Sequence, residues 1–407
     1  MWHDSLRRGV TAVALAGLVG LGLVGCGQSS GASGDTIKVG TSLPLTGEFS
    51  QPGAAAKQGY EIWRQMVNAD GGLLGKDVDL VVKDDASNQN TIVSDYNALI
   101  SQDKVSLLLG TFSSLLNLPA SAVAEKNQML YVEPAGGSPE MFSRGFKYLF
   151  FSQQAVSDQQ GIPYAEYIAS LPADERPKTA AYPTLDDPFA APVVEGARKA
   201  LEKAGVKTVY KQTYAIDTKN FDTIAAAIKN VKPDLVFHGA QFEDGVGLTR
   251  AMLKAGFTPK MYFETNAPSF GEQYAKGIGA KNTEGVTFAV SYSPQAKTPG
   301  NTDFVAAFKK KYGELPAEDA ADAYAAGQVL QAAVAGVGSA DDQTKLADWL
   351  RGHTVQTILG PLKWDDTGAP IGSYLIGQWQ GGQARIVLPE GAATAKIKPA
   401  WTPGGAQ

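Results

Sequence analysis

Residues 105–118 read VSLLLGTFSSLLNL and combine a short apolar run, a glycine, two adjacent serines and the start of a helix. The run predicts a buried strand ending at Gly110, and the turn after it leaves unpaired N–H groups at the helix start. With the hydroxyls of Ser113 and Ser114, these groups form a candidate anion site. Helix capping alone also favours serine here. In a parallel α/β sheet, ligands bind outside the carboxyl ends of the strands, which is where this site would lie.

The first 35 residues have the features of an export signal followed by a linker. Arg7 and Arg8 precede an uncharged run, 9–25, that is too short and too rich in glycine for a membrane span. The run ends in LVGC at 23–26, which resembles the lipobox of bacterial lipoproteins. That resemblance implies cleavage before Cys26 and a diacylglycerol on its sulfur. We therefore predict a signal peptide over 1–25 and a flexible tether over 26–35.

Composition limits the class of protein. Cys26 is the only cysteine in the 407 residues, so an intramolecular disulfide and a thiolate metal cluster are both excluded. The formal net charge is −5, and loss of 1–25, with two arginines and one aspartate, makes it one unit more negative. Nucleic acid is not the expected partner, because it calls for a clustered basic surface. The remaining length suits two domains of about 100 to 200 residues each.

From residue 36 onward, short apolar strands alternate with amphipathic helices, which is the signature of parallel βαβ units. The first part has predicted strands at 37–43, 78–84, 105–110 and 129–134 and predicted helices at 54–68, 90–102 and 115–127. The pattern restarts after 148–151, with predicted helices at 158–170, 190–204, 221–230 and 245–255 and predicted strands at 179–183, 206–214, 234–240, 260–265 and 285–292. We therefore predict an α/β fold with two doubly wound parallel-sheet lobes.

The C-terminal part departs from this alternation. Predicted helices at 302–312, 317–337 and 343–351 are followed by β-like runs at 373–379 and 384–388 and a Pro/Gly-rich tail. A late block of helices followed by late strands suggests that the chain returns to both lobes.

Common catalytic signatures are missing from the places where they would act. The sequence has no G-x-G-x-x-G after the first strand, no Walker A, no H-E-x-x-H, and no G-x-S-x-G between a predicted strand and helix. His238 lies in an apolar strand and His353 follows a helix, so both are expected to be structural. The acidic pairs 84–85 and 365–366 are expected in turns and caps, because consecutive strand residues face opposite sides. These features favour a binding protein, with no enzyme activity, cofactor or metal.

Several stretches, in order, carry a family resemblance: 37–53, 67–87, 110–121 (GTFSSLLNLPAS), 131–140 (YVEPAGGSPE), 233–245 (PDLVFHGAQFEDG), 319–334 and 357–368 (TILGPLKWDDTG). With them the chain resembles the periplasmic solute-binding proteins of ABC importers, in the branch of the leucine/isoleucine/valine-binding protein. The resemblance implies two lobes joined by three crossing segments that act as a hinge, with the ligand trapped between the lobes. It covers 36 to about 391.

The resemblance also sets the expected boundaries. The expected parts are lobe 1 over 36–153 plus 293–360, lobe 2 over 154–292 plus 361–392, and a tail over 393–407. The expected crossings lie near 152–157, 290–294 and 359–362.

Four site positions on the first lobe follow from the resemblance. Ser114 matches the serine that binds the ligand carboxylate, with Ser113 adjacent. The backbone carbonyl of Ala135 matches the group that accepts from the ligand's amino group. Gly137 stands where the family has a threonine. A hydroxyl and helix N-terminal N–H groups can hold a carboxylate without a buried cation, at roughly 1.5 to 3 kcal/mol per charged hydrogen bond.

The second lobe contributes three positions. Phe189 matches an aromatic residue that closes over the ligand's apolar part, although core packing would explain it equally well. Gln241 stands at another aromatic position. Thr265 aligns with the acid that pairs with an ammonium group, and Glu264, one position earlier, cannot be assumed to replace it because a one-residue offset reverses a strand side chain.

These departures leave the ligand class open. An unpaired ammonium in a closed cleft would be costly. An organic or aromatic acid, or a neutral amide, is therefore an alternative to an amino acid. Asp319 and Asp322 could supply negative charge, although we expect them on a solvated helix face.

The resulting prediction is a lipid-anchored, extracytoplasmic solute-binding protein of an ABC importer. It would act as a monomer, capture a small amino acid of the branched-chain type or a related carboxylate, and present it to a membrane permease. A sensory module of the same fold is one alternative. An extracytoplasmic enzyme is another, but the sequence offers Ser114 without a well-placed histidine.

Overall fold

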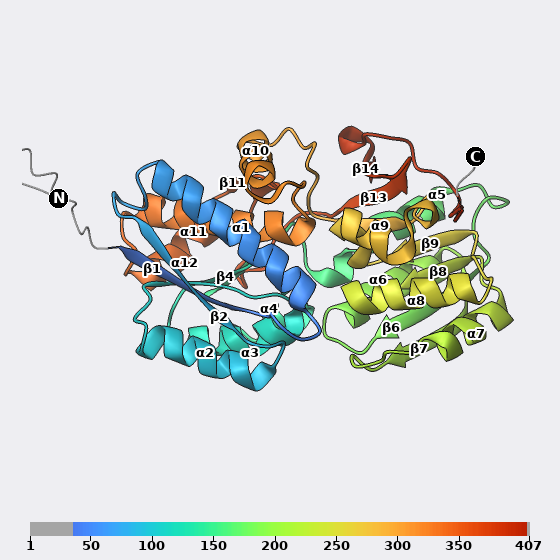
Figure 1. Ribbon diagram of the computed structural model, residues 1–407, viewed down its shortest axis with the longest axis horizontal. Helices are drawn as coiled ribbons and strands as arrows, with labels where there is room; N and C mark the ends of the chain where they lie inside the picture. The colour runs from blue at the N-terminus through green and yellow to red at the C-terminus, as the bar shows by residue number, and fades with distance from the viewer. Residues whose placement is uncertain (1–35, 405–407) are drawn as a thin grey trace, which may run out of the picture. The chain divides into compact units, whose positions relative to one another are not determined.

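The computed structural model describes residues 36–404, which are organised around two β-sheets (Figure 1). The predicted signal peptide, Cys26 and the tether 26–35 lie outside the described residues. The part built on the smaller sheet is called the first lobe below, and the part built on the larger sheet the second lobe.

The first lobe has a five-stranded parallel sheet in the order β2-β1-β3-β4-β5. Its strands are β1 (Ile37–Leu43), β2 (Val78–Asp84), β3 (Leu107–Leu109), β4 (Tyr131–Glu133) and β5 (Leu149–Phe151). The helices between them are α1 (Ser50–Ala69), α2 (Gln89–Ser101), α3 (Ser114–Lys126) and α4 (Pro139–Phe142). The later elements α10 (Asn301–Tyr312), α11 (Glu318–Val337), α12 (Gln343–Gly352), β11 (Val355–Thr357) and β12 (Gly360–Leu362) follow the second lobe in the chain.

The second lobe has a seven-stranded sheet in the order β14-β13-β10-β9-β8-β6-β7. Its strands are β6 (Thr179–Leu185), β7 (Lys207–Tyr214), β8 (Leu235–His238), β9 (Met261–Glu264), β10 (Thr287–Val290), β13 (Leu375–Gln380) and β14 (Gln383–Leu388). Its helices are α5 (Ile162–Ser170), α6 (Ala190–Lys203), α7 (Asp222–Val231), α8 (Phe242–Lys254) and α9 (Glu272–Ile278), with short 3₁₀ turns η1 (Ser157–Gln159), η2 (Ala267–Phe270), η3 (Ala280–Asn282) and η4 (Glu390–Ala392).

The two sheets repeat one topology, and the predicted fold class is confirmed. The order β7-β6-β8-β9-β10 in the second sheet has the same connectivity as β2-β1-β3-β4-β5 in the first, a doubly wound order in which ligands bind at the carboxyl ends of the strands. The late hairpin β13–β14 adds an antiparallel edge next to β10. The second sheet is therefore mixed at that edge, whereas the sequence pattern indicated only parallel pairing.

Small residues bring helices α1 and α11 into close contact (Figure 1). A Cβ atom on Gly59 would lie 1.9 Å from the carbonyl oxygen of Ala320, and one on Gly327 would lie 2.4 Å from the Trp63 ring. Backbone therefore packs against backbone and ring at these points, as close approach requires. This packing fixes α11, and with it the position of the acidic residues in its first turn.

Three segments connect the lobes, and the third lies later than the sequence indicated. The first two join β5 to η1 and β10 to α10, as expected at 152–157 and 290–294. After β12, however, Trp364 Nε1 donates to Phe151 O at 2.7 Å, and Phe151 N donates to Gly368 O. The chain runs beside β5 there, because the turn supplies hydrogen-bond partners to that edge strand. It passes to the second sheet only between Gly368 and β13, after the expected 359–362.

Candidate ligand-binding site

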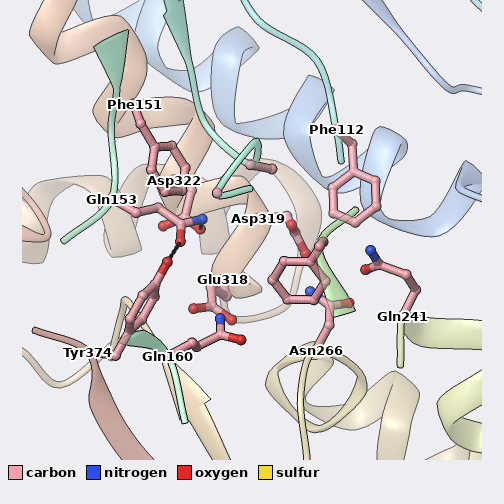
Figure 2. A pocket seen from close by; sticks show the side chains of 13 residues that line it. Phe112, Phe151, Gln153, Gln160, Gln241, Asn266, Glu318, Asp319, Asp322 and Tyr374 are labelled. Atoms are coloured by element: carbon pink, nitrogen blue, oxygen red, sulfur yellow. Dashed lines mark hydrogen bonds between the residues drawn. The ribbon is translucent and has the colours of Figure 1, made fainter. Parts of the chain in front are cut away.

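A cavity lies at the carboxyl ends of strands from both sheets, beside the first turn of α11 (Figure 2). It is lined by Phe112, Ala135, Gly137, Phe151, Gln153, Gln160, Phe189, Gln241, Asn266, Glu318, Asp319, Asp322 and Tyr374. The predicted residues Ala135, Gly137, Phe189 and Gln241 are in this set, whereas Ser113, Ser114 and Thr265 are not.

The start of α3 stands directly behind the cavity wall formed by Phe112. Ser113 is buried with φ of +69° and ψ of +150°, a backbone region that costs an L-residue about 1 to 3 kcal/mol. Its hydroxyl has no hydrogen-bond partner among residues 36–404. The hydroxyl of Ser114 accepts from Ser138 N at 3.0 Å, so it already organises the neighbouring loop. These are features of a strained, incompletely satisfied helix start, which suits a polar ligand group.

The loop after β4 forms the adjacent wall and is organised by a buried carboxyl. Glu133 Oε2 accepts from the backbone N–H groups of Ala135 and Gly136. Burial raises the pKa of Glu133 to about 8, against the effect of these two hydrogen bonds. The carboxyl thus folds the loop back on itself, which sets the positions of Ala135 and Gly137 in the cavity wall.

On the second lobe, Asp187 places both predicted residues. Its carboxylate accepts from the N–H of Phe189 at 3.0 Å and from that of Ala190 at 2.6 Å, at the start of α6. The other oxygen accepts from Gln241 Nε2 at 2.9 Å. One buried carboxylate therefore orients an aromatic ring and a carboxamide on the same wall.

Thr265 has a structural role at the end of β9. Its hydroxyl donates to Ala240 O and accepts from Ala240 N at 2.8 Å, which uses its hydrogen-bonding capacity within the lobe. The next residue, Asn266, lines the cavity instead. Glu264 faces away, as the strand alternation indicated: it accepts from Tyr274 Oη at 2.7 Å inside the lobe, and burial raises its pKa to about 8.

The expectation that Asp319 and Asp322 lie on a solvated helix face is wrong. Both residues are buried, 4% and 1% exposed, and both line the cavity together with Glu318. Burial raises the pKa of each of these three carboxyls, and their mutual repulsion raises the pKa of Asp319 and Asp322 further. Asp319 Oδ2 has no hydrogen-bond partner in the part of the chain that the structure describes. None of the described lining residues is Lys, Arg or His.

Asp322 joins the three connecting segments. Its carboxylate accepts from Gln153 Nε2 at 2.6 Å, on the first segment, and from Ser291 Oγ at 2.5 Å, on the second. Tyr374, on the third, donates to Gln153 Oε1 at 2.7 Å, the bond drawn in Figure 2. The base of the cavity and the hinge are therefore the same set of hydrogen bonds.

Sequence reasoning missed the α11 acids, although a signal existed. Residues 317–337 carry alanine, glycine and valine on every side of the helix, and a helix that is apolar all round is buried. Acids within it must then be buried too, and need a partner or a ligand. Gln160 and Asn266 lie in irregular segments, where no periodic pattern marks them.

Comparison with known proteins now places the chain. The family model described as "Periplasmic binding protein" matches residues 36–384. The chain belongs to this family. Its relatives in the curated sequences include several Leu/Ile/Val-binding proteins, so it falls in the branch of the leucine/isoleucine/valine-binding protein. The protein is a solute-binding protein of this family, and the family implies a location outside the cytoplasm.

Individual relatives differ in the solute that their names record. An "Amino acid binding protein" of Pseudomonas aeruginosa is 28% identical over 380 residues, which covers 92% of this chain and 96% of the relative. A leucine binding protein from Thermotoga maritima shares the fold with a TM-score of 0.78 and 22% identity, over 86% of this chain and 97% of that one. A solute binding protein from R. palustris in complex with benzoate has a TM-score of 0.79 and 21% identity, over 90% and 99%.

No helix within residues 36–404 combines the length and apolar character needed to cross a membrane.

Proposed function

We propose that this protein captures a small solute bearing an ammonium group, an α-amino acid foremost, and delivers it to an ABC permease. The observation that carries the proposal is Asp319 Oδ2, a buried carboxylate oxygen without a partner in the described residues, in a cavity wall that has acids and lacks basic side chains. An ammonium group supplies up to three N–H donors and the opposite charge. Asp319 can therefore pair with an amine even though Thr265 stands at the position where the family has an acidic residue.

The other end of an amino acid would meet the first lobe. The start of α3 offers N–H groups and the free hydroxyl of Ser113 to a carboxylate. The ammonium would meet Asp319, and the rings of Phe112, Phe151 and Phe189 would contact the apolar atoms between. Because the ligand touches both lobes only when they are together, its binding energy favours closure, and the closed form would be what the permease recognises.

The anchor and the transport role complete the proposal. The LVGC motif favours a lipid on Cys26, which would hold a monomeric protein at the outer face of the cell membrane beside its permease. A permease gene next to this gene would support the importer role, whereas a neighbouring kinase gene would favour a sensory module.

A second candidate ligand is an organic or aromatic acid without an amine. It is favoured by the three phenylalanine rings and by the raised pKa values of the α11 acids, because a protonated carboxyl can donate to a ligand carboxylate. The two candidates differ in pH dependence. Affinity for an ammonium rises with pH as the protein carboxyls ionise, and affinity for an anion falls.

Thermal unfolding of the full-length chain in detergent, with matched solutes, separates the two candidates. The pairs are leucine and 4-methyl-2-oxopentanoate, asparagine and succinamate, and phenylalanine and phenylpropionate, with benzoate added. A solute at one hundred times its Kd adds about 2.7 kcal/mol to the free energy of unfolding. We expect stabilisation by amino acids only. Stabilisation only by the deaminated acids or benzoate would make this an organic-acid receptor.

A further inference from the structure

Three carboxamides in the cavity wall have oxygens without a protein partner, and two of them, Gln160 and Asn266, also have no other side-chain hydrogen bond within residues 36–404. Gln160 Oε1 and Asn266 Oδ1 are buried atoms without a hydrogen-bond donor among residues 36–404, and Gln160 as a residue is 6% exposed. Both residues come from the second lobe, at the end of η1 and the start of η2. Figure 2 shows both side chains pointing into the space that Glu318 and Asp319 face.

The other two cavity carboxamides provide an internal comparison. Gln153 donates to Asp322 and to Pro134 O at 2.7 Å and accepts from Tyr374, so it is held within the hinge. Gln241 donates to Asp187 through Nε2, although its Oε1 has no partner among the described residues. The side chains of Gln153 and Gln241 are therefore each held in position by a hydrogen bond to another part of the protein. Gln160 and Asn266 have no such bond from their side chains among the described residues.

Their positions are nevertheless fixed by the backbone. The N–H of Gln160 donates to Ser157 O at 2.9 Å, and the carbonyl of Asn266 accepts from both the N–H and the hydroxyl of Ser269. The two carboxamides are thus presented on ordered turns, and the unpaired groups are their side-chain ends. Buried polar groups in native proteins are paired, so an unpaired set at a cavity indicates a ligand group.

We propose that the solute carries a second polar group, a carboxamide or ureido group, that hydrogen-bonds to Gln160 and Asn266. A carboxamide offers both N–H donors and a C=O acceptor, which pairs with another carboxamide in either orientation. The inference rests on the proposed function, since it assigns the rest of an ammonium-bearing solute. It directs the site toward asparagine, glutamine or citrulline and away from the branched-chain amino acids.

The closing test compares asparagine with leucine, whose side chains have nearly the same shape and differ in polarity. Isothermal titration of the full-length chain in detergent would use asparagine, glutamine, citrulline and leucine. A site built to bind a polar group rejects an analogue without it by up to about 10⁵-fold. We expect at least one of the three polar amino acids to bind more tightly than leucine by about 30-fold or more.

Two variants and a control locate the effect. Gln160→Met and Asn266→Leu keep side-chain size and remove the amide, and each should weaken binding of the preferred polar amino acid by about 10-fold or more while changing leucine affinity by less than about 3-fold. Gln159→Met, at the adjacent exposed position, should change neither.

The outcomes separate this inference from the proposed function. Leucine binding as tightly as the polar amino acids, or equal losses for both classes in the variants, would overturn the inference and leave the amino-acid function standing. Binding of succinamate and 4-methyl-2-oxopentanoate without binding of any amino acid would overturn the function itself.

Discussion

The starts of α3 and α11 have opposite chemistry, and they differ in place: α11 lines the cavity, whereas α3 begins behind the cavity wall formed by Phe112. At α3, a strained serine with a free hydroxyl leaves the helix start open to an anion. At α11, the first turn already carries Glu318 and Asp319, and Asp322 follows on the same side of the helix. Helix N-termini favour negative charge in both cases. At α3 the charge would come from the ligand, whereas at α11 it belongs to the protein, which leaves a negative site suited to a cation.

Under the proposed function, one structural feature, a helix N-terminus, would serve each end of a zwitterion. The α3 start is created locally, by a strand, a turn and two serines. The α11 start depends on packing, because contacts with α1 press its acids into a buried position. Removal of a single hydroxyl should therefore alter the α3 start, whereas a change in the α1–α11 contact should alter the α11 start.

The largest expected effect concerns that helix contact. Gly59→Ala places a Cβ 1.9 Å from the Ala320 carbonyl oxygen, so α11 must shift, and we expect a loss of about 3 kcal/mol in the free energy of unfolding. Gly352→Ala is the matched control, since no atom lies within 4 Å of its Cβ position. Urea denaturation of both variants measures this. Equal stability of the two would show that α11 is not held by this contact.

Removal of a hydroxyl tests the α3 side. Ser114→Ala should weaken amino-acid binding by roughly 1 to 3 kcal/mol, because it removes a polar group of the anion site and the bond to Ser138 N. The fold should remain intact by circular dichroism. Unchanged affinity in a calorimetric titration would refute the anion site.

The carboxyl behind this site gives a pH dependence. Burial raises the pKa of Glu133 to about 8 from the ordinary value of about 4.3, so the folded protein keeps a proton that the unfolded chain loses. Stability is therefore greatest below the unfolded pKa and falls as pH rises toward 8, by up to about 1.4 kcal/mol per pH unit. Glu133→Gln should make the slope between pH 5 and 8 shallower by that amount, while Glu264, whose pKa burial also raises to about 8, keeps its own contribution. If the free energy of unfolding of the variant fell with pH as steeply as that of the wild-type protein, Glu133 would not be a source of the pH dependence.

The smallest expected effect is relief of strain at Ser113. Ser113→Gly should raise the free energy of unfolding by about 1 kcal/mol, because glycine tolerates a φ of +69°. Thermal unfolding checks this without ligand, and the same variant should bind the solute less tightly if the hydroxyl contacts it. A loss of stability would mean that the hydroxyl is paired in solution.

Much of the fold, and part of the site, could be predicted from the sequence. Strand and helix periodicity predicted both sheets, and the turn after β3 predicted a helix start at Ser113 and Ser114. The third crossing was placed too early, because Trp364 and Gly368 bond to β5 across a long sequence separation. The burial of Asp319 depends on how α11 packs against α1. A local sequence pattern does not tell how close a helix lies to a loop that is distant in the chain.

The most direct test of the account is proton release on binding. Because burial raises the pKa of Asp319, pairing with an ammonium should drive its ionisation and release protons. Titration of asparagine and leucine into the full-length chain, in two buffers of different ionisation heat, counts those protons. We expect net release by the wild-type protein, and less release with about 30-fold or more lower affinity for Asp319→Asn. Proton uptake on binding, or an Asp319→Asn variant identical to wild type, would contradict the account.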